Sequence, residues 1–206
     1  MNLPSHLLEQ AVDEFAKLPG VGKRTALRYV LHLLKQDKTE LMKWSATIAR
    51  LSEDIKYCSN CFAISEDTVC AICSNPARDH TTICVVEDIR DLIAIENTSQ
   101  YHGTYHVLGG IISPINGIGP LDLNIAPLIK RVEAVTTKEI IMAMPSTMEG
   151  DTTNFYLFKK LSPFNLTMST LSRGVSIGDE LQYADEVTLG QSIILRVPYE
   201  SSVVRK

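Results

Sequence analysis

Apolar residues in the first quarter of the chain recur every three or four positions, which is the spacing of an amphipathic helix. A first helix is predicted to begin after Ser5, which can cap it, and to extend to about Phe15. LPGVG interrupts this pattern, and KRTALRYVLHLLKQ resumes it. A third helix is predicted to begin at Thr39, as its cap, and to end near Ile55. This part of the chain therefore predicts three helices with a glycine turn between the first two.

The pattern changes after residue 80, where short apolar runs alternate with stretches of helical spacing. Strands are predicted at 81–87, 105–110, 139–144 and 165–172. Helices are predicted at 88–98, 125–132 and 151–161. A long loop rich in Pro, Gly and Asn is expected at 111–124. Because strands alternate with helices, the fold class is α/β with a parallel sheet covered by helices.

Composition and charge narrow the class of protein. Of the 206 residues, 45% are hydrophobic and 21% are charged, which is ordinary for globular proteins. No apolar run approaches the ~20 residues of a membrane helix. The first residues carry acids where a signal peptide would be basic and then apolar. We therefore expect a cytoplasmic protein without membrane association, whose five cysteines stay reduced.

Four of those cysteines form two pairs, Cys58-x-x-Cys61 and Cys70-x-x-Cys73. Four thiolates suit a tetrahedral zinc ion, with iron as an alternative metal. Since sulfur fills every position, the metal would be structural, and its binding would supply much of the folding energy of so short a segment. Free or disulfide-bonded cysteines are the plainer alternative. Cys84 lies within an apolar strand and is predicted to be a small buried side chain.

The glycine turn LPGVGKRTALR (18–28) is a candidate phosphate site. The net charge of the chain is −4, but residues 1–57 carry +2 and residues 58–206 carry −6. Gly20 and Gly22 permit close backbone approach, and the helix start offers N–H groups to a phosphate. Lys23, Arg24 and Arg28 add positive charge. The pattern resembles a helix-hairpin-helix, which binds the DNA backbone without reading sequence, although such turns also simply connect helices.

Acidic residues follow two predicted strands. Glu87 ends the first strand, and Glu149 and Asp151 follow the third. Parallel sheets place their sites at these strand ends, and three acids there resemble the Toprim domain of topoisomerases and primases, in which acids hold magnesium. The Toprim pattern has Asp-x-Asp where this chain has Glu-x-Asp. Asp151 or Thr152 is also predicted to cap the following helix.

The order of hairpin, four-cysteine insert and Toprim-like sheet resembles the bacterial RecR family along essentially the whole chain. The matching stretches are LPGVGKRTALR, CSNC and CAIC, TTICVVE, YHVLGGIISPINGIGP, PSTMEGDTT and SRGVSIGDELQYADEVTL. Ser59 replaces a proline that many members have. The resemblance implies four parts: a helix-hairpin-helix region at 1–56, a zinc finger at 57–77, a Toprim domain at 78–174 and an oligomerisation segment at 175–206.

The resemblance also implies a non-enzymatic role in DNA repair. RecR proteins form ring-like oligomers, often tetramers, and act with RecO, and in many bacteria RecF, to load RecA onto single-stranded DNA. By motif match, the glycine turn and its three cations would contact single- or double-stranded DNA at the nucleoid. The three acids would contact RecO or bind Mg²⁺ weakly. A metal-dependent Toprim-type nuclease and a pure protein-interaction module are the alternatives, and the segment 178–197 reads on its own as a polar loop followed by a helix.

Overall fold

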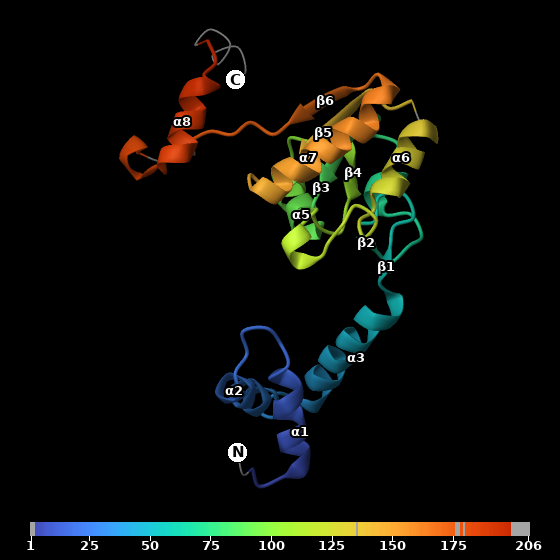
Figure 1. Cartoon of the computed structure of the whole chain (residues 1–206). Coiled ribbons are helices and arrows are strands. Elements are labelled where there is room, and N and C mark those ends of the chain that lie inside the picture. Colours follow the sequence, from blue (N-terminus) through green and yellow to red (C-terminus); the bar gives the residue numbers. More distant parts are fainter. Residues whose placement is uncertain (1–2, 135, 176–177, 179, 199–206) are drawn as a thin grey trace. The chain divides into compact units, whose positions relative to one another are not determined.

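The computed structural model describes residues 3–134, 136–175, 178 and 180–198 (Figure 1). The chain divides into two compact units. The first unit ends at Ile55 and the second begins at Lys56.

The amino-terminal unit contains three helices, as predicted: α1 (His6–Phe15), α2 (Lys23–Leu33) and α3 (Lys38–Asp54). Ser5 caps α1, because its hydroxyl oxygen accepts from the Leu8 N–H at 3.4 Å. The buried core of this unit is small and consists of Val12, Ala26 and Val30. Phe15 stacks on Trp44 with ring centroids 5.9 Å apart.

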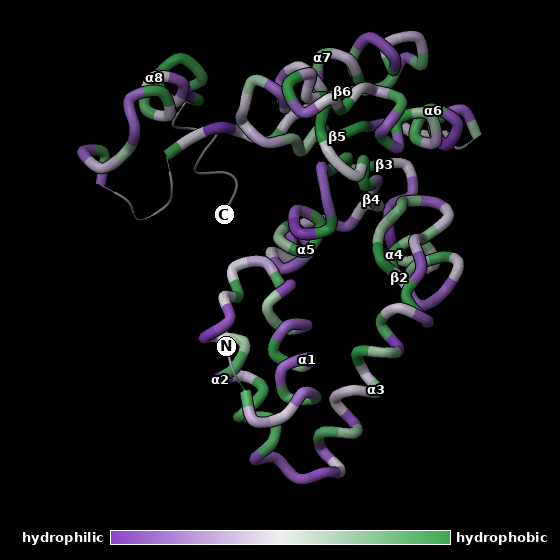
Figure 2. The backbone as a smooth tube through the Cα atoms, turned by 60° about the horizontal axis from the view of Figure 1, so that its bottom comes forward, coloured by the Kyte–Doolittle hydropathy of each residue, from purple (hydrophilic) through white to green (hydrophobic). Residues whose placement is uncertain are grey.

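The predicted cap of the third helix was wrong by two residues. The Asp37 carboxylate, not Thr39, is the N-cap, and it accepts from the Thr39 N–H at 2.9 Å. Thr39 lies in the first turn, so its N–H is one of the groups that need a cap. None of the residues of α3 is buried, and in Figure 2 hydrophobic and hydrophilic segments alternate along it. Apart from Trp44, which stacks on Phe15, its apolar side is therefore largely uncovered within the described part of the chain.

The second unit is built on a parallel sheet with the strand order β4-β3-β5-β6, which confirms the predicted fold class. Its strands are β3 (Asp79–Val86), β4 (Gly103–Val107), β5 (Glu139–Ala143) and β6 (Thr167–Thr170). Its longer helices are α5 (Ile89–Asn97), α6 (Ile125–Ala134), α7 (Met148–Leu161) and α8 (Glu186–Ile194). The shorter elements are β1 (Lys56–Tyr57), β2 (Ile64–Ser65), α4 (Ala71–Ser74), η1 (Pro114–Asn116), η2 (Ser162–Phe164) and η3 (Leu181–Tyr183).

The central strand β3 buries both of its faces, and this explains why it reads as a continuous apolar run. Ile83 and Val85 pack with side chains of α6 and α7. Cys84 and Val86 point to the opposite face and pack with α5 and the cysteine insert. Cys84 is 1% exposed and is the buried apolar residue that the sequence predicts.

The cysteine insert covers an edge of the sheet. β4 is an edge strand, and such a strand presents unpaired backbone groups. The Val107 N–H donates to the Cys61 carbonyl oxygen at 2.8 Å, and the Phe62 ring contacts the His106 ring edge to face at a centroid distance of 5.5 Å. The insert is thus attached to β4 by backbone and side chain together.

The predicted boundaries shift at several elements. The strand expected at 105–110 is displaced toward the amino terminus, since β4 ends at Val107 and the two glycines at 109–110 have positive φ. The loop at 111–124 contains the short helix η1, which ends at Gly117 in the left-handed region. The predicted helix at 151–161 begins three residues earlier, at Met148.

The carboxyl-terminal segment forms the helix α8, in line with the predicted loop and helix. Asp185 caps it by accepting from the Thr188 N–H at 2.8 Å. No residue of α8 is buried, and Val187 and Ile194 are 75% and 68% exposed. This helix therefore presents apolar side chains that the described part of the chain does not cover.

Candidate functional site

The four cysteines of the insert form a compact cluster of sulfur atoms. The ligand atoms of Cys58, Cys61, Cys70 and Cys73 all lie within 4.8 Å of one another, and Cys61 Sγ and Cys70 Sγ are 3.5 Å apart. Four sulfurs bonded to one zinc ion at ~2.3 Å would be separated by about 3.8 Å in a tetrahedron. All four side chains are buried. The cluster therefore fits a closed, four-sulfur zinc site.

Backbone N–H groups favour a thiolate at one of these positions. The Cys70 N–H donates to Cys58 Sγ at 3.3 Å. Burial raises the pKa of the Cys58 thiol, but the N–H groups of Cys70, Cys61 and Asn60 together outweigh burial and lower this pKa to about 7. By contrast, the hydrogen bond with the Cys73 thiol raises the pKa of Cys61, and burial raises the pKa of Cys70 to about 11. Burial also raises the pKa of Cys84, outside the cluster, to about 12. The insert thus contains a sulfur that loses its proton readily for a metal.

The glycine turn of the amino-terminal unit has the backbone geometry of a phosphate site. Gly20 has φ +75°, a conformation that side chains rarely adopt. The Val21 N–H closes the turn on the Leu18 carbonyl oxygen at 3.0 Å. Gly22 is the N-cap of α2, and no side chain caps that helix. The first N–H groups of α2 therefore remain available to an anion.

The predicted DNA-contacting cations Lys23, Arg24 and Arg28 are all exposed around this turn. Arg24 and Arg28 line a groove of about 440 Å³ on α2, together with Lys35. Lys23 is different, because its ammonium group lies 3.1 Å from the Asp13 carboxylate of α1. The sequence shows no acid between the basic residues, yet the folded unit brings one beside Lys23.

The three Toprim acids lie on two elements of the second unit. Glu87 follows β3, and its carbonyl oxygen accepts from the N–H groups of Gly109 and Gly110 at 2.9 and 3.1 Å. Burial raises the pKa of the Glu87 carboxyl, and repulsion from Asp91 and Asp88 adds to this.

Glu149 and Asp151 lie in the first turn of α7. The predicted caps of this helix, Asp151 and Thr152, were wrong, because the Thr147 hydroxyl is the cap and accepts from the Gly150 N–H at 3.1 Å. Both acids still stabilise the start of α7, because their negative charge interacts favourably with the helix dipole.

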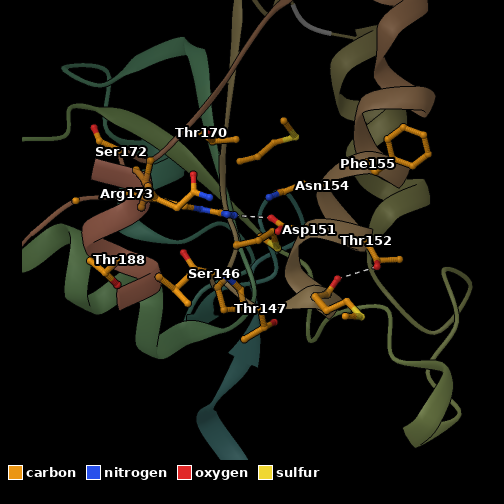
Figure 3. A pocket seen from close by; sticks show the side chains of 18 of the residues that line it. Ser146, Thr147, Asp151, Thr152, Asn154, Phe155, Thr170, Ser172, Arg173 and Thr188 are labelled. Carbon is orange, nitrogen blue, oxygen red and sulfur yellow. Dashed lines mark hydrogen bonds and ion pairs between the residues drawn. The ribbon is translucent and has the colours of Figure 1, made fainter. Parts of the chain in front are cut away.

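Asp151 is neutralised by a basic residue from the segment that follows β6. Its carboxylate lies 2.5 Å from the guanidinium of Arg173. Both side chains line a cavity of about 1110 Å³ (Figure 3). Among the described residues, the four cysteines are the one group of three or more His, Cys, Asp or Glu side chains close enough to share a metal ion. The structure therefore does not gather the three acids into such a group.

Comparison with known proteins identifies the family. Family models match at residues 8–51 (RecR, helix-hairpin-helix), 55–75 (the RecR zinc finger domain with four cysteines), 81–172 (Toprim domain) and 174–197 (RecR, C-terminal). Recombination protein RecR of Flavobacterium johnsoniae is 57% identical over 98% of both chains, and that of Phocaeicola vulgatus is 58% identical over 94% of both. The chain belongs to the RecR family.

The order of the matched family models along the chain agrees with the order of the modules in the structure. Its helix-hairpin-helix model covers the glycine turn, its zinc finger model covers the sulfur cluster, and the Toprim model covers the parallel sheet. In the described part of this RecR chain, no helix has both the length and the apolar character needed to cross a bilayer.

Several residues around these RecR modules were not identified from the sequence. Arg173, which neutralises Asp151, belongs to a stretch that carried the family resemblance but had no assigned role. Arg78 forms a bidentate contact with the Glu96 carboxylate of α5. His106 is fully buried. Each depends on a partner at least 18 positions away in the chain, so no local pattern could reveal it.

Proposed function

We propose that this RecR-family protein is a non-enzymatic, DNA-binding recombination mediator. In this proposal it acts at the bacterial nucleoid as a ring-like oligomer, expected to be a tetramer, and binds single- and double-stranded DNA without sequence preference. With RecO, and RecF where present, it loads RecA onto single-stranded DNA during repair. The relatives named as recombination proteins support this role.

The observation that carries the proposal is the exposed, uncapped start of α2 beside basic side chains. A phosphate oxygen can accept from the free N–H groups that follow Gly22, while Arg24 and Arg28 supply charge to neighbouring phosphates. Such contacts hold the DNA backbone but read no base, as a mediator of general repair requires. Several hairpins on one ring would increase the effective concentration of weak individual contacts.

The four-sulfur cluster has a structural role in this proposal. Zn²⁺ would be held by Cys58, Cys61, Cys70 and Cys73, and would fix the turn between the first two of these residues. Because sulfur fills all four positions, no place is left on the metal for a reacting water. The metal would therefore shape the insert against β4 without taking part in chemistry.

The Toprim acids are proposed to contact RecO instead of cleaving DNA. The pairing of Asp151 with Arg173 supports this view, because that carboxylate already has a cationic partner within the chain. Neither Glu149 nor Glu87 has such a partner among the described residues, and of the two only Glu149 lies at the same helix start as Asp151. We propose Glu149 as the acid most available to a basic partner surface, with weak Mg²⁺ binding as its secondary role.

The test compares the Arg24→Glu/Arg28→Glu variant with Lys43→Glu, an exposed cation on α3. We expect the hairpin variant to bind single-stranded DNA more than a hundredfold more weakly, because two attractive charges become repulsive, and the control to change little. The fall of log K with log[salt] should be less steep in the hairpin variant than in the wild type. The difference in slope should be about 0.7 for each phosphate that the variant no longer neutralises.

RecO association provides the second readout of the same experiment. The hairpin variant should retain it, whereas Glu149→Lys should weaken it and leave DNA binding and zinc content intact. Undiminished DNA affinity in the hairpin variant would refute DNA binding through this turn. Cleavage of DNA by the wild type in Mg²⁺ or Mn²⁺ would refute the non-enzymatic role.

A further inference from the structure

A second basic pocket lies between the cysteine insert and α6. One wall is the turn Ser59–Asn60, between the first two cysteines, another is one face of α6, and Cys73 and His80 complete the lining. Pro127, Lys130, Arg131 and Ala134 line the α6 wall at positions i, i+3, i+4 and i+7, which is a single helical stripe. The pocket has a volume of about 400 Å³. It belongs entirely to the second unit and so differs from the hairpin.

Arg131 is held in place at the floor of this pocket. Its Nη1 donates to the carbonyl oxygen of Tyr105 at 2.6 Å and to that of Asn60 at 3.5 Å. Its Nη2 donates to the Thr104 hydroxyl at 2.7 Å. These contacts fix the plane of the guanidinium against the edge strand β4 and link α6 to the insert. They use three of its five N–H donors.

The remaining donors of Arg131 have no partner among the described residues. They are Nε–H and one N–H of Nη2, which can donate to the oxygens of an anion. The fixed contacts on the other side mean that little conformational freedom is lost when an anion binds. Arg131 is thus prepared for an anion that can accept two hydrogen bonds.

The charge of the pocket contrasts with that of the unit around it. Residues 58–206 carry a net charge of −6, yet no Asp or Glu is among the described residues that line the pocket. Lys130 forms no ion pair within the described chain. Two cations without a counter-ion in an otherwise acidic unit create a local attraction for anions.

We infer that this pocket binds a phosphodiester group of a nucleic-acid strand, with Arg131 donating to the phosphate oxygens and Lys130 providing a point charge above them. Pro127 and Ala134 leave apolar surface beside the two cations, which suits a sugar next to the phosphate, whereas a bare carboxylate would leave that apolar surface unused. The Ser59 hydroxyl and the Asn60 side-chain amide belong to the opposite wall and are further donors. The inference extends the proposed DNA binding to a second contact, and rests on it.

The proposed phosphate contact depends on the cysteine cluster, because the insert forms one wall of the pocket. Ser59 and Asn60 lie between Cys58 and Cys61, so the wall they form keeps its shape only while the turn does. The same turn accepts the hydrogen bond from Arg131. An insert whose metal ion has only a structural role would in this way also complete a binding surface.

The test uses the full-length, zinc-loaded protein and a short single-stranded oligonucleotide of mixed sequence. Lys130→Glu is compared with Lys160→Glu, an exposed cation on α7 that lies outside the pocket. We expect Lys130→Glu to lower DNA affinity about tenfold and the salt slope by about 0.7, and Lys160→Glu to leave both unchanged. Arg131→Lys, which keeps the charge but removes the two-donor geometry, should lower affinity by a smaller factor.

Hydrogen exchange locates the contact. DNA should slow amide exchange in peptides that contain 57–61 and 127–134 in the wild type but not in Lys130→Glu. Equal DNA affinity and salt slope in Lys130→Glu and Lys160→Glu would overturn the inference while leaving the hairpin result intact. Protection of these peptides by inorganic phosphate at matched ionic strength, without protection by DNA, would also overturn it by showing that the source is a free anion.

Discussion

The cysteine insert and the helical hairpin unit are both small, but they are stabilised in opposite ways. The insert buries all four of its metal-ligand candidates and offers a backbone acceptor to an edge strand of the sheet. The hairpin unit has a core of three buried side chains, and its longest helix buries none. Ile48 and Leu51 on that helix are about half exposed. The insert thus combines a buried sulfur cluster suited to a metal ion with a backbone bond to the sheet, whereas the longer hairpin unit depends on modest packing.

This difference assigns different tasks to the two regions. A rigid insert can complete a pocket with α6, because its turn is fixed at both ends by cysteines. The hairpin unit leaves apolar side chains without cover, and such surface is typical of contacts between chains. We expect that surface, and the exposed apolar residues of α8, to become buried in the oligomer proposed above.

Removal of the metal should produce the largest difference in stability between the two regions. Structural zinc contributes about 10 kcal/mol or more to the folding of small zinc modules, so chelation should unfold the insert and expose the edge of β4. The thermal midpoint of the second unit should fall by more than about 10 °C, the largest change we predict. Trp44, the single tryptophan of the chain, lies in the hairpin unit against Phe15, and its fluorescence should not change.

The matched variants for this test are Cys61→Ser and Cys84→Ala. Both remove a buried thiol, but only the first belongs to the cluster. Zinc measured by mass spectrometry should be lost from Cys61→Ser and retained by Cys84→Ala. Retention of zinc in both, or a change in Trp44 fluorescence on chelation, would mean that the two regions are not stabilised in the way described.

Acidification should distinguish the regions by a smaller amount, through His106. This side chain is fully buried, and its Nε2 lies 2.7 Å from the Asn124 carbonyl oxygen, to which it donates. Burial lowers the pKa of His106 to about 4, against about 6.5 in an unfolded chain. Between these values the unfolded state binds a proton that the folded state does not. The contribution of His106 to stability is therefore full above about pH 6.5 and falls toward pH 4, by up to about 3 kcal/mol.

His106→Gln tests this assignment, because glutamine keeps a donor near the Nε2 position but does not titrate. Urea unfolding of the second unit should show much less pH dependence between about 4 and 6.5 in this variant. His80→Gln, at an exposed position, should behave like the wild type. Zinc content must be followed in parallel, since acid also displaces metal from thiolates. An unchanged slope in His106→Gln at constant zinc would contradict the assignment.

The sequence predicted the parts of the molecule whose cause is local. The second half of β3 and most of β5 are buried, so their apolar runs are visible in the chain. The spacing of the paired cysteines can be read directly from the sequence, as can the glycines and cations of the glycine turn. In each case the residues that form the feature are neighbours in the chain.

The errors and omissions arise where two local signals compete or where the partner is distant. Asp37 and Thr39 are both good cap residues, and only the folded backbone shows which one precedes the first turn. The same holds for Thr147 against Asp151. The contact of Arg173 with Asp151 requires the chain to pass through a further strand before it returns, so it follows from topology and not from a motif.

The smallest effect we predict lies within the hairpin itself. Gly20 and Gly22 are two residues apart, and an added Cβ would meet no atom within 4 Å at either position. Gly20 has φ +75°, whereas Gly22 has φ −80°. Gly20→Ala should therefore lower the free energy of unfolding of the amino-terminal unit by about 1–2 kcal/mol through backbone strain alone. Gly22→Ala should change it by only about a few tenths of a kcal/mol, because the weaker N-cap preference of Ala is offset by the lower entropy of the unfolded chain.

Unfolding monitored by Trp44 fluorescence gives the two values directly, since this side chain packs within the same unit. Equal costs would show that the strained turn at Gly20 does not determine the shape of the hairpin. The expected inequality would show that this loosely packed unit relies on one glycine for its turn, whereas the insert relies on four sulfurs. Because neither added Cβ meets another atom, the comparison excludes packing and leaves the positive φ of Gly20 and the N-cap position of Gly22 as the differences.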